Sequence, residues 1–390
     1  MSPASARLRL LALAGDITAL VAQIRVVTPL QALCARDGHT LALRSLHDCS
    51  RDDLAAADVL VVQRGLSRRS WQLQRWMRQR GGAVVYDIDD LLTELPPHIS
   101  NRAAVAAQLH WLPRCLGESD ALSVSTKNLQ QMLAERLVLP PAVVVPNHAL
   151  LPDDMPLPPQ TEVPVTLVFA STENVAVDGI FPALQALQRE QPTLQMVVVG
   201  PPGAAFEAAG LRVRRQALMP REAFLSFVHG LPNPVGVVPL EDGRFAAGKS
   251  AVKWMYYASI GVPTLCSAVS PYAEVIEDGR TGWLVSNTTQ AWEAALQAVI
   301  ADAPLRLCVA DAARREVALH HGLGVTLAAW REVLALAVQQ QQARALAPAD
   351  SGVSFQDLLA MLAEGSVGRL RGFNRARLAK RQARKQTDRV

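Results

Sequence analysis

The chain has 390 residues, of which 50% are hydrophobic and 19% are charged. This length exceeds one ordinary domain and fits two, and the composition excludes a globally disordered protein. The five cysteines are dispersed without paired or metal-ligand spacing, so we expect reduced thiols in a cytoplasmic protein. No apolar run reaches the roughly 18 residues that a membrane span requires.

The first half of the chain alternates short apolar strands with amphipathic helices. Arg7–Gly15 has the basic flank of an export signal, but its apolar part is short, so we interpret Leu8–Ala14 as a buried strand. The other predicted elements are strands Thr40–Leu43, Asp58–Val62, Ala83–Tyr86, Asp120–Val124 and Val143–Val145, and helices Pro29–Asp37, Trp71–Gln79 and one capped by Ser125-Thr126 that runs to Leu137. This alternation predicts a doubly wound domain over residues 1–150.

Prolines are dense over residues 151–164, which predicts a linker, and the alternation then restarts. The predicted elements are strands Val165–Ala170, Gln195–Val199, Val235–Leu240 and Thr264–Ser267, and helices Gly179–Gln188, Ala223–His229 and several from Gln290 to Val338. We therefore expect a second α/β domain over residues 165–338. Gln339–Gln342 begin a further linker, Phe355–Leu362 could form a short helix, and a tail follows.

The net charge of +4 is unevenly distributed. Nine basic residues and one acid fall within Ser366–Val390, so the rest of the chain is net acidic. The tail could bind anionic lipid headgroups or be a solvated, disordered segment. Nucleic-acid binding is not expected, because Phe373 is the only aromatic residue among these charges.

Two doubly wound, Rossmann-like domains would face each other across a cleft, with ligands bound beyond the carboxyl ends of the strands. The first-domain residues expected there, on the acceptor side, are Asp16, Arg64 and Asn147. The second domain would contribute Ser171, Thr172 and the Gly200 turn.

Three carboxylates, Asp87, Asp89 and Asp90, follow one predicted strand. If they converge, mutual repulsion would raise one pKa and provide a general base. Binding of a divalent ion and a simple helix cap are the alternatives.

The segment Lys249–Val285 is the most informative part of the chain. It is predicted to form a helix opened by Lys249, Ser250 and Lys253, a Gly-Val-Pro turn, a strand, and a second helix with Ser270 as its cap and Pro271 as its first residue. A helix start with two lysines favours a diphosphate. We expect Lys249, Ser250, Lys253, Tyr272 and Glu274 to hold a phosphorylated sugar.

The motifs Ala258-Ser-Ile-Gly-Val-Pro-Thr264 and Glu274-Val-Ile-Glu-Asp-Gly-Arg-Thr-Gly-Trp-Leu-Val285 resemble the donor domain of GT-B glycosyltransferases of family four (glycosyl transferases group 1). Tyr86–Asp90 is more loosely similar to the acceptor domain of a subgroup of these enzymes. The resemblance implies transfer of a sugar from a nucleotide sugar to an acceptor hydroxyl, often in bacterial surface polysaccharide synthesis. It implies no metal or other cofactor in this chain, and a glycan or lipid-linked acceptor.

The chain departs from this family at the paired glutamates, whose positions fall at Gly248 and Tyr256. The resemblance implies that Tyr256 would take over contacts to the ribose. The missing carboxylates motivate an alternative, in which the protein is a non-catalytic nucleotide-sugar-binding or scaffold relative that partners an active transferase. A nicotinamide-dependent oxidoreductase has the same layers, but the chain lacks the glycine fingerprint of that class.

Overall fold

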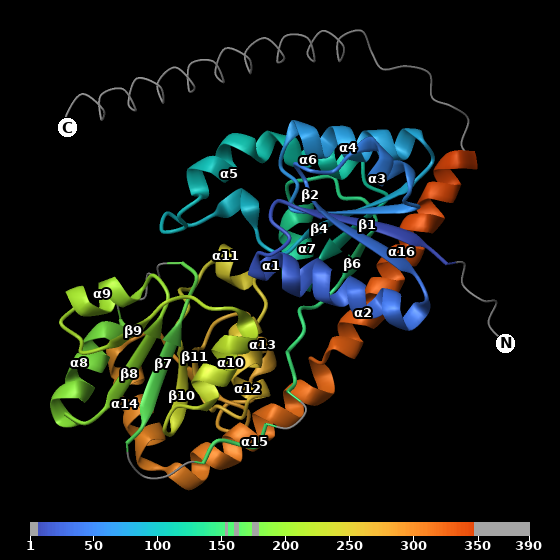
Figure 1. Ribbon diagram of the computed structural model, residues 1–390. Coiled ribbons are helices and arrows are strands. Elements are labelled where there is room, and N and C mark those ends of the chain that lie inside the picture. The colour runs from blue at the N-terminus through green and yellow to red at the C-terminus, as the bar shows by residue number, and fades with distance from the viewer. Residues whose placement is uncertain (1–6, 153–154, 160–163, 174–178, 347–390) are drawn as a thin grey trace, which may run out of the picture. The chain divides into compact units, whose positions relative to one another are not determined.

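The computed structural model describes residues 7–152, 155–159, 164–173 and 179–346 (Figure 1). The chain up to Arg344 forms one compact unit, which contains two six-stranded sheets. Of the second unit, Ala345–Val390, only the first two residues are described. The predicted helix Phe355–Leu362 and the basic tail therefore lie outside the described residues.

The first sheet has the strand order β2-β1-β3-β4-β5-β6, and all of its neighbouring strands are parallel. The order reverses direction at β1, which is where doubly wound sheets leave a crevice for ligands. Its strands are β1 (Arg9–Ala14), β2 (Thr40–Ser45), β3 (Val59–Gln63), β4 (Ala83–Ile88), β5 (Ala121–Val124) and β6 (Ala142–Val144).

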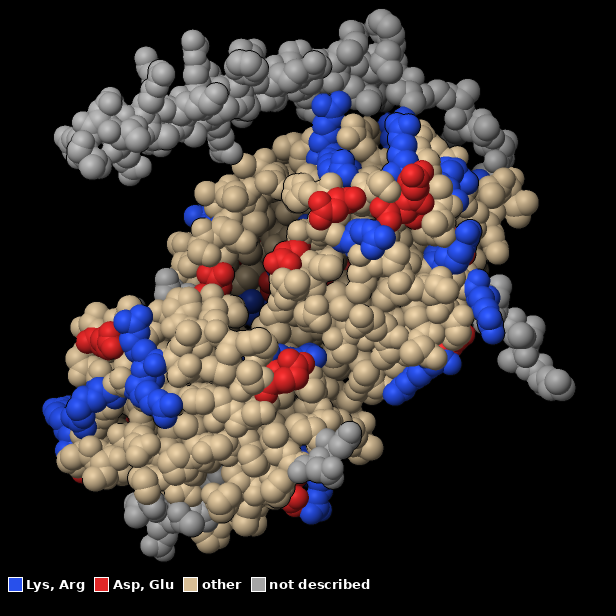
Figure 2. Space-filling view, viewed as in Figure 1, with Lys and Arg blue, Asp and Glu red and all other residues tan. Residues whose placement is uncertain are grey.

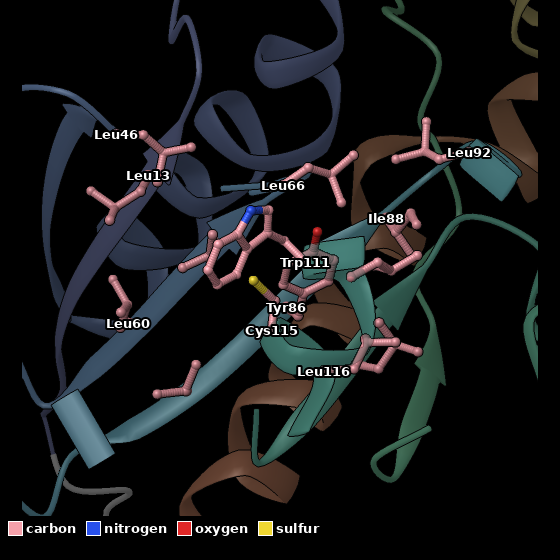
Figure 3. Packing of buried hydrophobic residues seen from close by; sticks show 14 of the residues in the cluster. Leu13, Leu46, Leu60, Leu66, Tyr86, Ile88, Leu92, Trp111, Cys115 and Leu116 are labelled. Carbon is pink, nitrogen blue, oxygen red and sulfur yellow. The ribbon is translucent and has the colours of Figure 1, made fainter. Parts of the chain in front are cut away.

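Helices cover both faces of this sheet, as Figure 1 shows. They are α1 (Leu20–Ala22), a π-helix (Gln23–Val27), α2 (Thr28–Asp37), α3 (Arg51–Ala55), α4 (Arg68–Gln79), α5 (Arg102–Gln108), α6 (Leu112–Gly117), α7 (Lys127–Ala134) and two 3-10 turns (Leu92–Glu94 and Leu109–Trp111). On one face Tyr86 of β4 packs with Trp111 and Cys115 (Figure 3). Because side chains alternate along a strand, Val85 points to the other face.

The second sheet has the order β12-β11-β10-β7-β8-β9 and is also parallel. Read from β9, this is the Rossmann order, with its switch point between β7 and β10. Its strands are β7 (Thr166–Ala170), β8 (Gln195–Val199), β9 (Arg214–Gln216), β10 (Pro234–Val238), β11 (Thr264–Ser267) and β12 (Trp283–Val285). Its helices are α8 (Ile180–Glu190), α9 (Gly203–Ala208), α10 (Arg221–His229), α11 (Arg244–Ala247), α12 (Val252–Ser259), α13 (Tyr272–Val275), α14 (Thr289–Ala301) and α15 (Ala303–His320).

We call the first sheet with its helices the first lobe, and the second sheet with its helices the second lobe. In the second lobe, α8 and α14 pack on one face of the sheet, and α10, α12 and α15 pack on the other. Trp254 of α12 is fully buried and donates a hydrogen bond to the Thr281 carbonyl over 2.8 Å. The predicted architecture of two doubly wound layered domains is confirmed.

The last helix, α16 (Leu323–Leu346), departs from the prediction. Its residues Leu327, Trp330 and Val333 are buried in the first lobe beside β1 and β3. Gln339–Gln342 continue this helix, because the apolar spacing of its buried face persists to Ala337 and glutamine is a good helix former. The prediction of a linker at these glutamines, after a second domain ending at 338, was wrong.

Among the helices of the described residues, none combines the length and the apolar character needed to cross a bilayer.

Candidate functional site

A cleft of about 1330 Å³ lies where the carboxyl ends of both sheets meet. Gly15 and Arg64 line it at the switch point of the first sheet, and Ser171 and Leu240 line it at that of the second. Figure 2 shows the surface hollowed, with acidic and basic side chains around the hollow. Both lobes therefore contribute their ligand-binding edges to one cleft.

Two of the three predicted carboxylates line the cleft together. Asp89 accepts a hydrogen bond from Nε of Arg64, and Asp90 accepts one from Nη2 of Arg64 at 2.5 Å. Burial and the neighbouring Asp90 carboxylate raise the pKa of Asp89, against the opposing effect of Arg64. For Asp90 burial acts in the same direction, but Lys249 and Arg64 outweigh it and lower the pKa. The acids thus differ in proton affinity, as acid–base chemistry requires.

Asp87, the third carboxylate, does not line the cleft. Strand β4 continues to Ile88, two residues beyond the predicted end, so Asp87 lies within the strand and is fully buried. Its carboxylate accepts hydrogen bonds from Arg25 Nη2 at 2.6 Å and Ser123 Oγ at 2.7 Å. The three acids therefore do not converge, because β4 extends past Asp87 and its carboxylate is held inside the fold by Arg25 and Ser123.

Lys249 lines the cleft from the second lobe and contacts the first. Its Nζ donates to Asp90 Oδ1 at 3.2 Å and lies 4.3 Å from the centre of the Phe245 ring. Beside it, Ser250 Oγ accepts a hydrogen bond from Asn147 Nδ2 at 2.7 Å. Lys249 and Ser250 precede α12, which begins at Val252, so the prediction that they open the helix was wrong by one turn.

One face of α12 lines the cleft through Lys253 and Tyr256. Burial and the neighbouring charge of Lys249 lower the pKa of Lys253 to about 8. Burial raises the pKa of the Tyr256 phenol, against an opposing effect of Arg221. At neutral pH this face therefore presents an ammonium group and an un-ionised phenol.

Ser171 and Thr172 follow β7 and line the cleft, whereas Gly200 itself does not. Gly200 has a φ of +98°, and a Cβ atom there would lie 2.1 Å from the Ser171 carbonyl oxygen. A side chain would thus push Ser171 out of place. The absence of a side chain at Gly200 therefore allows Ser171 to take its place in the wall of the cleft.

Of the remaining predicted residues, Tyr272 and Asn147 line the cleft, while Asp16 and Glu274 do not. Asp16 is exposed and accepts hydrogen bonds from the amide and hydroxyl of Thr18. Glu274 accepts hydrogen bonds from Asn128 Nδ2 at 2.8 Å and from the Ser270 hydroxyl. Ser270 does not cap α13, which begins at Tyr272 after Pro271 as its N-cap. The hydrogen bond to Asn128 turns Glu274 towards α7 instead of the cleft.

Arg25 and Arg221 also line the cleft, although neither was predicted from the sequence. Arg25 is buried in the π-helix, where its Nη1 donates to Asn147 Oδ1 at 3.0 Å and to the Val145 carbonyl at 2.5 Å. A lone arginine within an apolar helix was the available signal. Arg221 is the first residue of α10, which begins two residues before the predicted start.

In the part of the chain that the structure describes, no group of three His, Cys, Asp or Glu side chains is placed to hold a metal ion. Asp89 and Asp90 are instead paired with cations.

Comparison with solved structures decides the fold. Sucrose-phosphate synthase from Thermosynechococcus elongatus superposes with a TM-score of 0.59 at 15% identity, over 84% of this chain and all of that one. Anabaena Alr3699/HepE in complex with UDP-glucose gives 0.56 at 12% identity, over 84% and 100%. The chain has the GT-B fold.

A third GT-B structure is a mutant of S. aureus TarM with fondaparinux, alpha-GlcNAc-glycerol and UDP. It gives a TM-score of 0.53 at 10% identity and covers 70% of this chain, which spans about 55% of the TarM chain. No family model matches the sequence, and no curated protein does. At these identities the comparisons establish the GT-B fold of the chain.

Proposed function

We propose that this protein is a glycosyltransferase of the family-four type, which moves a sugar from a nucleotide sugar in the second lobe to an acceptor hydroxyl in the first. One observation carries the proposal: Lys249 and Lys253 line a cleft at the carboxyl edge of a sheet with the Rossmann strand order. Complexes of similar folds with UDP and UDP-glucose support a nucleoside diphosphate as the ligand class.

The two lysines act on the leaving group. As the bond between the anomeric carbon and the diphosphate oxygen breaks, negative charge develops on the diphosphate. Lys249 and Lys253 neutralise this charge, and Ser250 adds a hydroxyl donor. The proposed chemistry uses no metal or other cofactor.

Asp89 is the general base in this proposal. It lines the cleft, and burial raises its pKa towards the range in which a carboxylate accepts a proton from an acceptor hydroxyl. The hydroxyl oxygen forms the new bond to the anomeric carbon, and its proton moves to Asp89. Asp90 holds Lys249 in the absence of ligand.

The acceptor is a glycan or lipid-linked saccharide of surface polysaccharide or glycoconjugate synthesis, and the protein acts in the cytoplasm. The basic tail would bring it to the inner face of the membrane. Co-sedimentation with vesicles that contain anionic lipid tests this location. Deletion of residues 366–390 should abolish co-sedimentation, and unchanged partitioning would refute the role of the tail.

Calorimetric titration with UDP, ADP, GDP and dTDP tests donor binding. At least one should bind, and K249M/K253M should weaken binding at least tenfold. K127M is the matched control, because Lys127 is an exposed lysine at the start of α7 and lies outside the cleft. Absence of binding for all four nucleotides would refute the proposal.

The rival function is a nucleotide-sugar-binding partner without turnover. Gly248 and Tyr256 favour it, since neither supplies the carboxylate that the family resemblance leads one to expect. It predicts nucleotide binding without hydrolysis or transfer, and co-purification with a second transferase. Release of free UDP from UDP-glucose or another nucleotide sugar by the purified protein would exclude it.

A further inference from the structure

Arg221 lines the cleft, yet it is only 7% exposed. Its Nη1 atom is buried and makes no hydrogen bond to any residue that the structure describes. Arg221 is also the first residue of the nine-residue helix α10, which follows Pro220 and is capped by no side chain of the described residues. The partial positive charge of a helix start therefore adds to a guanidinium group whose Nη1 lacks an acceptor.

A second buried donor lies beside Arg221. The guanidinium carbon lies 5.9 Å from the centre of the Tyr256 ring, and Tyr256 is likewise 7% exposed and lines the cleft. The Tyr256 hydroxyl is buried and makes no hydrogen bond of good geometry to a described residue, although the Arg221 guanidinium is near enough to lower its pKa. Two helices, α10 and α12, thus bring unsatisfied donors to one wall of the cleft.

The surrounding charges compensate Arg221 only in part, through an exposed ion pair with Glu222. Glu222 approaches Arg221 Nη2 to 3.6 Å, beyond hydrogen-bond distance, and its side chain is 66% exposed. Burial and the charges of Arg221 and Arg25 lower the pKa of His148 to about 4, so His148 is neutral at pH 7. A buried donor without an acceptor destabilises the free protein, and a ligand that supplies the acceptor recovers that free energy.

We propose that Arg221 and Tyr256 form a subsite for an oxyanion of the bound ligand, either a phosphoryl or a carboxylate group. The planar guanidinium fork matches both groups, and the phenol adds a further donor. The subsite adjoins the two lysines, because Tyr256 lies three residues beyond Lys253 on α12, about 4.5 Å along the helix axis. This inference rests on the proposed function in one respect: the ligand would carry this anion in addition to its diphosphate.

Titration of the full chain with inorganic phosphate tests the subsite without any nucleotide. In the K249M/K253M background, which removes the other cleft lysines, phosphate should still bind and raise Tm. Adding R221M should lower the phosphate affinity at least tenfold, and adding Y256F about threefold. E222Q is the matched control: it removes the neighbouring acid but keeps the guanidinium, and should not weaken phosphate binding.

The same variants separate a binding role from a structural one. R221M alone should melt no lower than the wild type without phosphate, because it removes a buried guanidinium whose Nη1 lacks an acceptor and whose one acidic neighbour is exposed. Equal phosphate affinity with and without Arg221, or no phosphate binding in the K249M/K253M background, would overturn the subsite. Arg221-dependent phosphate binding in a protein that binds no nucleotide would leave the subsite standing and refute the proposed function.

Two matched ligand pairs identify the source of the anion. UDP-glucuronate against UDP-glucose tests a carboxylate on the sugar, and adenosine 3′,5′-bisphosphate against AMP tests a phosphoryl group on the ribose. The wild type should prefer the anionic member of one pair at least tenfold, and R221M should lose that preference. Equal affinity within both pairs would contradict the requirement for a second anion.

Discussion

Lys249 Nζ lies 3.2 Å from Asp90 Oδ1, so an ion pair joins the second lobe to the first across the cleft. A diphosphate would compete with Asp90 for the same ammonium group. We expect D90N to bind UDP roughly fivefold more tightly, about 1 kcal/mol, because partly exposed ion pairs contribute up to that amount. Calorimetry at low salt measures the difference, and unchanged or weaker UDP binding would contradict it.

Replacement of Asp89 should lower the turnover number more than replacement of Asp90 does. D89N removes the proposed base and should lower kcat by a factor of about 10² to 10⁴ with little change in UDP affinity. D90N should retain more activity than D89N, since it loses only the partner of Lys249. A coupled assay for released UDP compares the two, and equal loss of kcat would refute Asp89 as the base.

The pH dependence of UDP binding should report on Lys253. Its pKa is lowered to about 8, so the free protein loses this charge as the pH rises through 8. The UDP phosphates are already ionised there. Affinity should fall about fivefold between pH 7.5 and 9 in the wild type and less in K253R, whose guanidinium stays protonated. Parallel pH profiles for both proteins would contradict this assignment.

His148 should make the protein acid-sensitive. Its folded pKa of about 4 lies below the ordinary value of 6.5, so the unfolded chain binds the proton more readily. The stabilisation from neutral His148 is present above pH 6.5 and is lost as the pH falls towards 4, on the order of 3 kcal/mol. Urea unfolding of the wild type and H148Q at several pH values measures it, and the difference between the two should shrink as the pH falls.

The buried pair of Arg25 and Asp87 should be intolerant of single changes. Both side chains are at most 1% exposed, so D87A leaves a buried guanidinium short of its main partner and should cost about 3–5 kcal/mol in the free energy of unfolding. R331M, which breaks the more exposed pair with Asp37, is the control and should cost less than about 1 kcal/mol. Urea denaturation midpoints compare them.

Gly200 and Gly210 form a matched pair. Both have positive φ angles, +98° and +75°, but a Cβ atom at Gly200 meets the Ser171 carbonyl at 2.1 Å, whereas one at Gly210 meets nothing within 4 Å. G210A should cost about 1 kcal/mol, from the backbone alone. G200A should cost more and should also weaken UDP binding, because Ser171 lines the cleft. Equal decreases in Tm for G200A and G210A would show that the contact between a Cβ atom at position 200 and the Ser171 carbonyl is unimportant.

The fold was accessible from the sequence because parallel strands such as Val59–Gln63 are continuous apolar runs with turn residues at their ends. The position of Lys249 at the cleft followed from the same pattern, since strand ends in parallel sheets share one edge. Asp87 was misplaced because β4 extends two residues beyond its predicted end, which puts Asp87 inside the sheet instead of at its edge.

The positions of Arg221, Glu274 and α16 could not be predicted without knowledge of tertiary contacts. The burial of Arg221 beside Tyr256 joins two helices that are distant in sequence, and the Asn128 amide that accounts for Glu274 belongs to the other lobe. The apolar face of α16 indicated a buried helix but not the sheet that it covers. Local patterns specify elements, whereas partners across the fold depend on contacts that no local pattern encodes.

The return of α16 to the first lobe has a consequence for biosynthesis. Trp330 is fully buried and donates a hydrogen bond to the Arg25 carbonyl, so part of the core around β1 comes from near the end of the chain. Domains ordinarily fold from the amino terminus as the ribosome releases them. Here the earliest strands emerge with part of one flank uncovered, and this part stays exposed until the whole second lobe has been translated.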